Sequence, residues 1–402
     1  MRVLISGASI AGPALAYWLT RYGYEVTVVE RAPQPRKTGG HSVDLWRPAL
    51  DIAQRMGVLP AIQKRSTATE RTLAYRPRVR RPALIDNTKI FTAVSDRHIE
   101  IMRDDLSEIF YDATRDTVEY VFADSITSIS EDGEVTFEQG EPRRFDLVIG
   151  ADGLHSNVRR LAFGPESQFT HWVGAYLAVI SVPRDLARDG DMIAHFDVGR
   201  TAMAYTAAHL DDARVLFLFR TERPLDYHHR DVARQKTLLR EHFAGLDGHV
   251  PRWLAELDRT PSFYFDSITQ IRLEKWSRGR VVLVGDAGLS PGPAIGASTS
   301  LAVVSAYVLA GQLAAAGGDH ARAFTAYQAE LEEFVRHSRA FASGMAKTLL
   351  PSHRLGLTLL VNGTELATSL PGGLTRWLAG LSSKGVRLFD SFPVRDYPPR
   401  TP

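Results

Sequence analysis

A glycine-rich turn near the N-terminus constrains the fold more than any other feature of this sequence. Gly7 follows an apolar run, residues 2–6, and Gly12 lies near the start of residues 10–22, where apolar side chains recur at helical spacing. A β-branched run follows and ends at Glu30. A strand, a helix and a second strand within about 30 residues are typical of a right-handed crossover between parallel strands. The sequence therefore predicts an α/β fold with a parallel sheet.

The spacing within this turn suits a dinucleotide. The first glycine allows a tight turn, the last lets helix and strand pack closely, and the helix N-terminus offers unpaired N–H groups to a pyrophosphate. Ser9 stands where a middle glycine is usual, and its small side chain still lets a ligand approach the backbone. Glu30 is suitably spaced to accept a hydrogen bond from a ribose hydroxyl. The alternative is a tight turn in an unrelated α/β protein.

Composition narrows the chemistry that the chain can carry. Its 402 residues include 48 basic and 46 acidic side chains, a net charge of +2, which argues against nucleic-acid binding. The sequence contains no cysteine, so disulfides, thiolate metal sites and redox-active cysteine pairs are excluded. His228 and His229 have no third ligand at a suitable spacing, and no metal site is predicted. Redox chemistry would need a borrowed cofactor.

No membrane-inserted segment is predicted. The apolar run after Arg2 is far shorter than the roughly 7–15 residues of a signal-peptide core. The long uncharged stretch that ends at Gly318 begins with Pro291, Pro293 and many small polar residues, unlike the roughly 20 apolar residues of a spanning helix. We therefore expect a cytoplasmic protein.

Two further apolar runs end in acidic residues. Asp152 and Gly153 follow residues 145–149, and Gly285 and Asp286 end the second run. A carboxylate at the end of a strand can accept hydrogen bonds from two hydroxyl groups of a polyol. A helix that begins next to it can stabilise negative charge through its N–H groups and dipole.

In this order and at this separation, the three segments resemble the class A flavoprotein monooxygenases, FAD-dependent aromatic hydroxylases of the para-hydroxybenzoate hydroxylase type. The resemblance covers roughly residues 1–340. It implies that the first turn holds the FAD pyrophosphate. It also implies that the Asp-Gly segment supports FAD and pyridine nucleotide, and that the Gly-Asp segment binds the ribitol.

The resemblance also implies a domain organisation. We expect a Rossmann-like FAD-binding domain, an inserted antiparallel-sheet substrate domain and a C-terminal helical region. The FAD-binding domain would be discontinuous and would comprise residues 1–65, 98–165 and 275–340. The substrate-binding β-sheet domain would comprise residues 66–97 and 166–274, and the helical region residues 341–402.

Shorter similarities favour the tetracycline-inactivating members of the family. Residues 100–106 resemble a helix whose leading arginine, here Arg103, reaches the flavin side of FAD, and residues 39–45, which include Asp44, resemble a segment beside the flavin. A surface ion pair and a solvated carboxylate are the alternatives for these two residues. The residues expected to bind the cofactor are Gly7, Ser9, Gly12, Glu30, Arg31, Arg36, Asp44, Arg103, Asp152, Gly285, Asp286, Pro293 and Gly296.

The chain also departs from the family pattern. Residues 285–289 read Gly-Asp-Ala-Gly-Leu where Gly-Asp-Ala-Ala-His is common, and residues 296–300 read Gly-Ala-Ser-Thr-Ser where Gly-x-Gly-x-Asn is usual. The donors needed there are mostly backbone N–H groups, so flavin binding is still expected. A degenerate flavin-binding scaffold remains an alternative.

The resemblance implies a monooxygenase that uses NADPH or NADH and O2 to hydroxylate an aromatic or polyketide-like small molecule through a flavin C4a-hydroperoxide. Baeyer–Villiger insertion and epoxidation are alternatives, because the same peroxide serves all three reactions. No catalytic side chain is predicted, since the flavin carries the chemistry. Arg200 and His195 are candidates for the substrate side. We expect a monomer or a homodimer.

Overall fold

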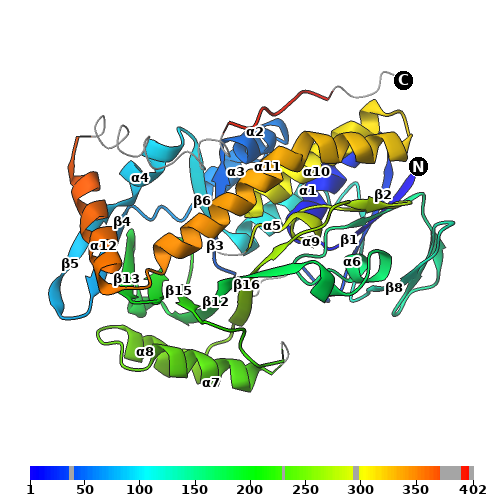
Figure 1. Ribbon diagram of the computed structural model, residues 1–402. Coiled ribbons are helices and arrows are strands. Elements are labelled where there is room, and N and C mark those ends of the chain that lie inside the picture. Colours follow the sequence, from blue (N-terminus) through cyan, green and yellow to red (C-terminus); the bar gives the residue numbers. More distant parts are fainter. Residues whose placement is uncertain (36–39, 229–230, 293–297, 372–390, 398–402) are drawn as a thin grey trace.

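The computed structural model describes residues 1–35, 40–228, 231–292, 298–371 and 391–397. Within these ranges the chain forms two large sheets and two small ones, with helices packed between and around them (Figure 1).

The first large sheet contains six of the described strands. In spatial order these are β17 (Ser277–Arg278), β18 (Val281–Leu283), β11 (Leu147–Gly150), β1 (Arg2–Ser6), β2 (Glu25–Glu30) and β7 (Glu119–Phe122). Neighbouring strands from β18 to β7 are parallel, and β17 is antiparallel to β18. The carboxyl ends of β1, β11 and β18 therefore lie side by side at one edge, the usual ligand-binding edge of such a sheet.

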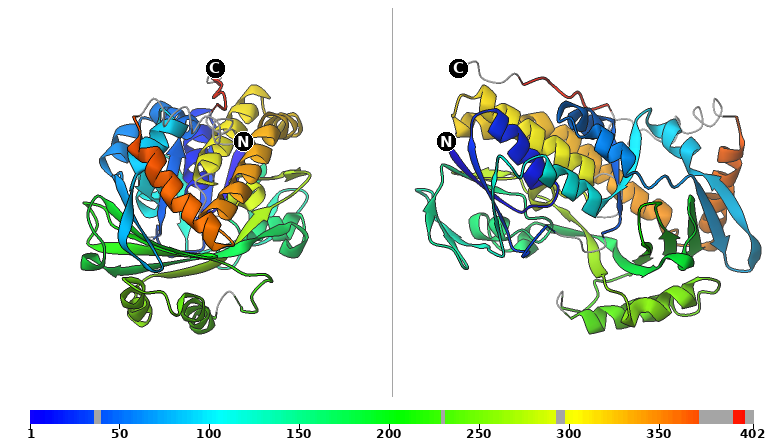
Figure 2. Two further views of the ribbon diagram at one scale, coloured as in Figure 1. Left: turned by 60° about the vertical axis from the view of Figure 1, so that its left-hand side comes forward. Right: turned by 180° about the vertical axis from the view of Figure 1, so that it is seen from behind.

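Helices cover this sheet because its central strands are apolar on both faces. Val3, Leu4 and Ile5 of β1 are fully buried, as expected for a parallel strand covered on both sides. Helix α10 (Ser298–Ala315) packs between α1 (Ala11–Arg21) and α11 (His320–Leu349), as Figure 2 also shows.

Helix α10 is long and apolar enough to cross a membrane by length and composition, with a mean hydropathy of 1.4. Within the protein, however, 78% of this helix is buried. A helix that is apolar on all sides and enclosed by other elements is typical of a protein core.

Shorter elements complete this part of the molecule. They are the antiparallel strands β8 (Ile126–Ile129), β9 (Glu134–Phe137) and β10 (Arg143–Arg144), the antiparallel pair β3 (Ser42–Trp46) and β6 (His98–Met102), and helices α2 (Arg47–Arg55), α3 (Leu59–Lys64), α5 (Arg103–Asp112), α6 (Asn157–Ala162) and α9 (Asp286–Leu289). The pairing of β3 with β6 was not anticipated from the sequence, because these strands are joined only through a long intervening segment.

The second large sheet contains seven of the described strands. In spatial order these are β16 (Phe263–Ile271), β12 (Thr170–Pro183), β15 (Asp212–Arg220), β14 (Arg200–Tyr205), β13 (Asp191–Asp197), β4 (Arg71–Arg76) and β5 (Val79–Asp86). Neighbours are antiparallel except β13 and β4. Strands β4 and β5 thus join a sheet whose other strands come much later in the chain.

The two faces of this sheet have different coverings. Helices α7 (Val232–Phe243) and α8 (Val250–Ala255) lie on the outer face, below the sheet in Figure 1. Helix α11 passes over the inner face, where Ala342 and Leu350 join its apolar cluster. Helix α12 (Arg354–Ser369) packs against β5 and β13, and α4 (Asn87–Val94) follows β5.

The predicted fold class is confirmed: an α/β sheet domain, an antiparallel second sheet and a helical C-terminal region are all present. The boundary expected between residues 340 and 341 falls inside α11. No proline interrupts residues 320–349, so a single helix continues from the first domain across the second sheet.

Candidate functional site

The turn between β1 and α1 is packed too tightly for a side chain at two of its positions. Gly7 has a φ of +108°, and a Cβ atom there would lie 2.5 Å from the carbonyl oxygen of Ala151. A Cβ atom at Gly12 would lie 1.9 Å from the carbonyl oxygen of Gly7. Among the described residues no side chain caps α1. Its first N–H groups are therefore available to a ligand.

Glu30, at the end of β2, is held next to this turn. Its Oε2 accepts a hydrogen bond from the N–H of Ala8 and its Oε1 accepts one from the N–H of Ala32, both at 2.9 Å. Each oxygen keeps a lone pair for a hydroxyl donor. Arg31 follows directly and is exposed.

Arg103, the first residue of α5, reaches the same turn. Its Nη2 donates to Oγ of Ser9 at 3.3 Å, and the hydroxyl of Ser107 donates to the carbonyl oxygen of Ser9 at 3.1 Å. The N–H of Gly40 donates to Oδ2 of Asp104 at 3.1 Å. The N-terminal end of α5 thus joins the glycine-rich turn to the chain that leads into β3.

The end of β18 meets the start of α1. A Cβ atom at Gly285 would lie 3.1 Å from the Cβ of Ala11, and the N–H of Gly285 donates to Oγ of Ser305 at 3.1 Å. Gly285 has a φ of +56°, which the sharp turn out of the strand requires.

Asp286 connects this strand end with Arg103. Its Oδ1 accepts a hydrogen bond from the hydroxyl of Ser298 at the start of α10. Burial raises the pKa of Asp286, while the hydrogen bond from Ser298 and the nearby Arg103 guanidinium lower it. Arg103 therefore lies within electrostatic range of Asp286 and in contact with Ser9. We call Gly7, Ser9, Glu30, Arg103 and Asp286 the strand-end cluster.

Asp152 has a mainly local role. Its Oδ2 accepts from the N–H of Val158 at 3.0 Å and its Oδ1 from the hydroxyl of Ser156, so the carboxylate fastens the start of α6. Burial raises its pKa. Its backbone reaches the strand-end cluster, because a Cβ atom on Gly7 would lie 3.0 Å from the Cα of Asp152.

Arg159 has a structural role that the sequence analysis did not predict. It is fully buried, and its guanidinium donates at 2.7 Å to the carbonyl oxygens of Ala287 and Leu154 and to the carboxylate of Glu166. It thereby fixes the loop after β11 against the turn after β18. Its position three residues after the capping Ser156 was the only available signal.

Asp44 lies on β3, and its Oδ1 is 2.7 Å from Nε2 of His98. Its carbonyl oxygen accepts from Oγ of Ser300 on α10 at 3.2 Å. Burial and the Arg103 guanidinium lower the pKa of His41 to about 4, while Asp44 acts in the opposite direction. Asp44, His41 and Arg103 are thus neighbours, and His41 is neutral at pH 7.

A half-buried carboxyl group lies on β6, next to β3. Glu100 on β6 accepts hydrogen bonds from the hydroxyls of Ser42, at 2.7 Å, and Thr67. Burial, with Asp44 nearby, raises its pKa. The N–H of Ser42 donates to Oη of Tyr205 at 2.6 Å, so Tyr205 joins β14 of the second sheet to the first domain.

The structure does not bring Arg200 or His195 to the strand-end cluster. The Arg200 guanidinium donates to the carbonyl oxygens of His242, at 2.7 Å, and Ala244, at 2.9 Å, at the end of α7. Nε2 of His195 is 2.9 Å from Nδ1 of His249, next to α8. These contacts place both side chains on the outer face. Since alternate residues of a strand face opposite sides, their immediate neighbours along each strand face inward.

The inner face of the second sheet carries an apolar cluster. Its residues include Leu177, Val179, Met203, Tyr205, Leu218 and Ile268. Met102, which immediately precedes Arg103, belongs to the same cluster. Strand alternation along β14 was the signal that could have selected Met203 and Tyr205 in place of Arg200.

Three expected cofactor contacts, Arg36, Pro293 and Gly296, lie outside the described residues. No group of three or more metal-ligating side chains occurs among the residues that are described.

Residues 1–342 match the family described as "FAD binding domain". The chain belongs to this family of class A flavin monooxygenases. It is 34% identical over 368 residues to a flavin-dependent monooxygenase of Legionella longbeachae, covering 87% of this chain and 90% of the relative. It is also 45% identical over 348 residues to the Mycobacterium tuberculosis protein Rv1260, covering 85% and 92% of the two chains.

Solved structures agree with this assignment. The crystal structure of the tetracycline destructase Tet(51) superimposes with a TM-score of 0.82 at 29% identity, covering 98% of this chain and 99% of that one. The structure of Klebsiella pneumoniae HpxO with FAD and uric acid shares the fold, with a TM-score of 0.74 at 21% identity and coverage of 96% and 97%. The predicted family, monooxygenase class and FAD cofactor are confirmed.

Proposed function

We propose that this FAD-dependent monooxygenase uses NADH or NADPH and O2 to hydroxylate an electron-rich aromatic or polyketide-like small molecule. The proposal is supported above all by Arg103, which contacts Ser9 of the glycine-rich turn and lies near Asp286 of a different strand end. Three chain segments thereby offer donors and acceptors suited to the two ends of one dinucleotide.

The residues present fit FAD. The turn at Gly7 and Gly12 leaves no room for a Cβ atom, so the backbone and the uncapped start of α1 would hold the diphosphate. Glu30 would accept from the adenosine ribose, and Asp286 from the ribitol. Held by these residues, FAD would supply the electron transfer from the nicotinamide coenzyme and the activation of O2.

The protein itself would orient the substrate and exclude water from the site. The apolar cluster on the inner face, with Met203 and Leu218, offers contacts to a flat apolar substrate and would exclude water from them. His41 lies near Arg103 and Asp44 and is neutral at pH 7. Its ring offers a ligand one N–H donor and one nitrogen acceptor without adding charge. We propose a polycyclic substrate, since the similar Tet(51) is a tetracycline destructase.

Anaerobic reduction of the purified FAD-containing protein by NADH and by NADPH tests the proposal, followed by addition of O2 with a panel of phenolic and polycyclic compounds. We expect one compound to stimulate coenzyme oxidation and to gain one oxygen atom in mass. NMR of the product then distinguishes hydroxylation from Baeyer–Villiger insertion or epoxidation. Coenzyme oxidation that yields hydrogen peroxide with every compound would contradict the proposal.

A further inference from the structure

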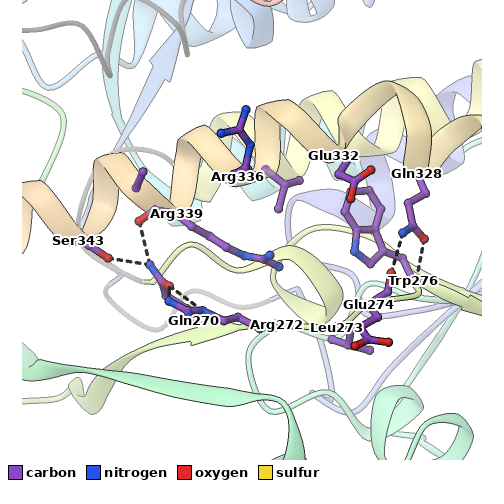
Figure 3. Close-up of a pocket in the computed structure, with 12 residues that line it drawn as sticks. Gln270, Arg272, Leu273, Glu274, Trp276, Gln328, Glu332, Arg336, Arg339 and Ser343 are labelled. Carbon is purple, nitrogen blue, oxygen red and sulfur yellow. Dashed lines mark hydrogen bonds between the residues drawn. The ribbon is translucent and has the colours of Figure 1, made fainter.

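A cavity of about 440 Å³ lies between the end of β16 and helix α11 (Figure 3). None of its described lining residues belongs to the strand-end cluster. The cavity nevertheless shares a wall with the loop that follows Asp286. The N–H of Ile271 donates to the carbonyl oxygen of Ser290 at 3.0 Å, and Nε2 of Gln270 donates to the carbonyl oxygen of Pro291 at 3.2 Å.

Two guanidinium groups line this cavity without a carboxylate partner. Arg272 donates through Nε and Nη2 to Oε1 of Gln270, at 3.3 and 2.9 Å, and Arg339 donates through Nη2 to the carbonyl oxygen of Ile271. Within the described part of the chain neither arginine forms a salt bridge, and the buried Nε of Arg339 has no hydrogen-bond partner.

Arg272 is close enough to Arg339 to disfavour the positive charge of Arg339. Burial, followed by the charge of Arg272, lowers the pKa of Arg339 to about 10. Arg339 is therefore still positively charged at pH 7. Like charges held together in a partly buried site are unfavourable until an anion is placed between them.

We propose that this cavity binds a phosphate-bearing anion between Arg272 and Arg339. Guanidinium groups form short, paired hydrogen bonds with phosphate oxygens. Ser343 adds a third donor: its Oγ accepts from Nε2 of Gln270 at 3.1 Å, which leaves the hydroxyl proton for a ligand. A phosphate group can present a separate oxygen to each of the three donors, whereas on a carboxylate the three donors would have to share two oxygens.

The opposite end of the cavity favours an organic body with hydroxyl groups. Leu273, Val335 and Trp276 provide apolar wall, and Glu274 and Glu332 provide carboxylates at that end. The carboxylates can accept hydrogen bonds from hydroxyl donors. The phosphate of a nucleotide, with its ribose hydroxyls, has this distribution of groups.

The same phosphate chemistry has two possible sources, free phosphate or the phosphate of a nicotinamide coenzyme. Only the second source rests on the proposed function. A coenzyme bound here would contact the wall formed by Gln270 and Ile271, and hence the loop after Asp286.

Isothermal titration of the FAD-containing protein with sodium phosphate, and separately with 2′,5′-ADP, tests the proposal. We expect saturable binding, weakened by about tenfold or more in Arg272→Gln, since hydrogen bonds to charged groups are the strong ones. Lys275→Gln is the matched control, because Lys275 is exposed, carries the same charge and does not line the cavity. The Lys275→Gln variant should bind both probes as tightly as the original protein does.

Arg272 is the chosen variant because Arg339 also supports the backbone of Ile271. Tighter binding of 2′,5′-ADP than of phosphate supports the proposal with a nucleotide as the source, and equal binding supports it with free phosphate. Absence of binding by both probes, or equal binding by Arg272→Gln, would overturn it. A parallel assay of coenzyme oxidation separates this result from failure of the proposed function.

Discussion

Arg103 donates a hydrogen bond from Nη2 to Oγ of Ser9 across 3.3 Å, although 94 positions separate the two residues in the sequence. Ser9 belongs to the turn between β1 and α1, and Arg103 begins α5. Burial raises the pKa of Asp286 at the end of β18, and the same guanidinium opposes that rise. One side chain is thus in electrostatic contact with both of the strand ends to which we assign the two halves of FAD.

Replacing Arg103 tests this relationship directly. Arg103→Ala removes a charged donor that no neighbour can replace, and FAD affinity should fall by about ten- to a hundredfold, the effect of one charge-assisted hydrogen bond. Arg103→Lys should recover part of the loss. Flavin fluorescence during FAD titration of the apoprotein measures the effect. Arg115→Ala is the control, since Arg115 pairs with Asp112 on the exposed end of α5, and equal losses in both variants would contradict the role of Arg103.

Gly12 should not tolerate a methyl group. In Gly12→Ala the new Cβ would lie 1.9 Å from the carbonyl oxygen of Gly7, so α1 would have to move and unfolding free energy should fall by about 1–3 kcal/mol. Gly363→Ala on α12 is the control, because a Cβ atom there meets nothing within 4 Å and alanine is the better helix former. Urea titration of both variants measures the difference, and an unchanged midpoint for Gly12→Ala would refute the packing argument.

The sequence predicted this turn well because its determinants are local. Glycines at fixed spacing, a β-branched strand and an acidic strand end are all within the first thirty residues, and they specify the turn without reference to the rest of the fold. The ends of β11 and β18 were predicted for the same reason. Their side-chain partners, such as Arg159 for Ala287, come from distant segments, and no local pattern encodes them.

The face of the second sheet on which each side chain lies was the hardest feature to predict from the sequence. The resemblance pointed to Arg200 as a substrate-side residue, and His195 was added as a polar residue nearby, but neither observation states which way a strand faces. Hydrogen bonds from Arg200 to the end of α7 fix its outward direction. The cavity beside α11 was also not anticipated, because Arg272 and Arg339 are far apart in the sequence and meet only through the packing of β16 on that helix.

The link between Tyr205 and Ser42 should contribute to stability. Tyr205→Phe removes the oxygen that accepts from the N–H of Ser42 at 2.6 Å, leaving a half-buried donor unpaired, at a cost of about 1–3 kcal/mol. Tyr111→Phe is the control, because the Tyr111 hydroxyl has no hydrogen bond among the described residues. Thermal unfolding followed by circular dichroism compares the two, and identical midpoints would show that the contact is not needed to join β14 to β3.

His155 should make stability depend on alkaline pH. Its ring lies 3.0 Å from Asp266 and 2.9 Å from Glu166, and hydrogen bonds to these carboxylates raise its pKa to about 10. The folded state therefore binds the proton more tightly than the unfolded state. The resulting stabilisation is complete below the ordinary pKa of about 6.5 and is lost as pH rises toward 10.

His155→Gln should accordingly lower the free energy of unfolding at pH 6, by about 1 kcal/mol or less because the side chain is half exposed. The deficit should shrink as pH approaches 10. Urea titrations at a series of pH values measure it, with His171→Gln as a control in which an exposed histidine is removed. A deficit that stays constant with pH would mean that His155 acts by packing and not by charge.

The two faces of β14 should separate substrate recognition from stability. On the proposed function, Met203→Ala removes apolar contact from the inner face, and KM for the substrate should rise on the order of tenfold. Arg200→Gln loses outer-face hydrogen bonds to the end of α7, so its melting temperature should fall while KM stays unchanged. Steady-state kinetics and thermal unfolding of both variants provide the comparison. If KM rose for Arg200→Gln and not for Met203→Ala, the substrate would contact the outer face of the sheet. That result would contradict the substrate position proposed here.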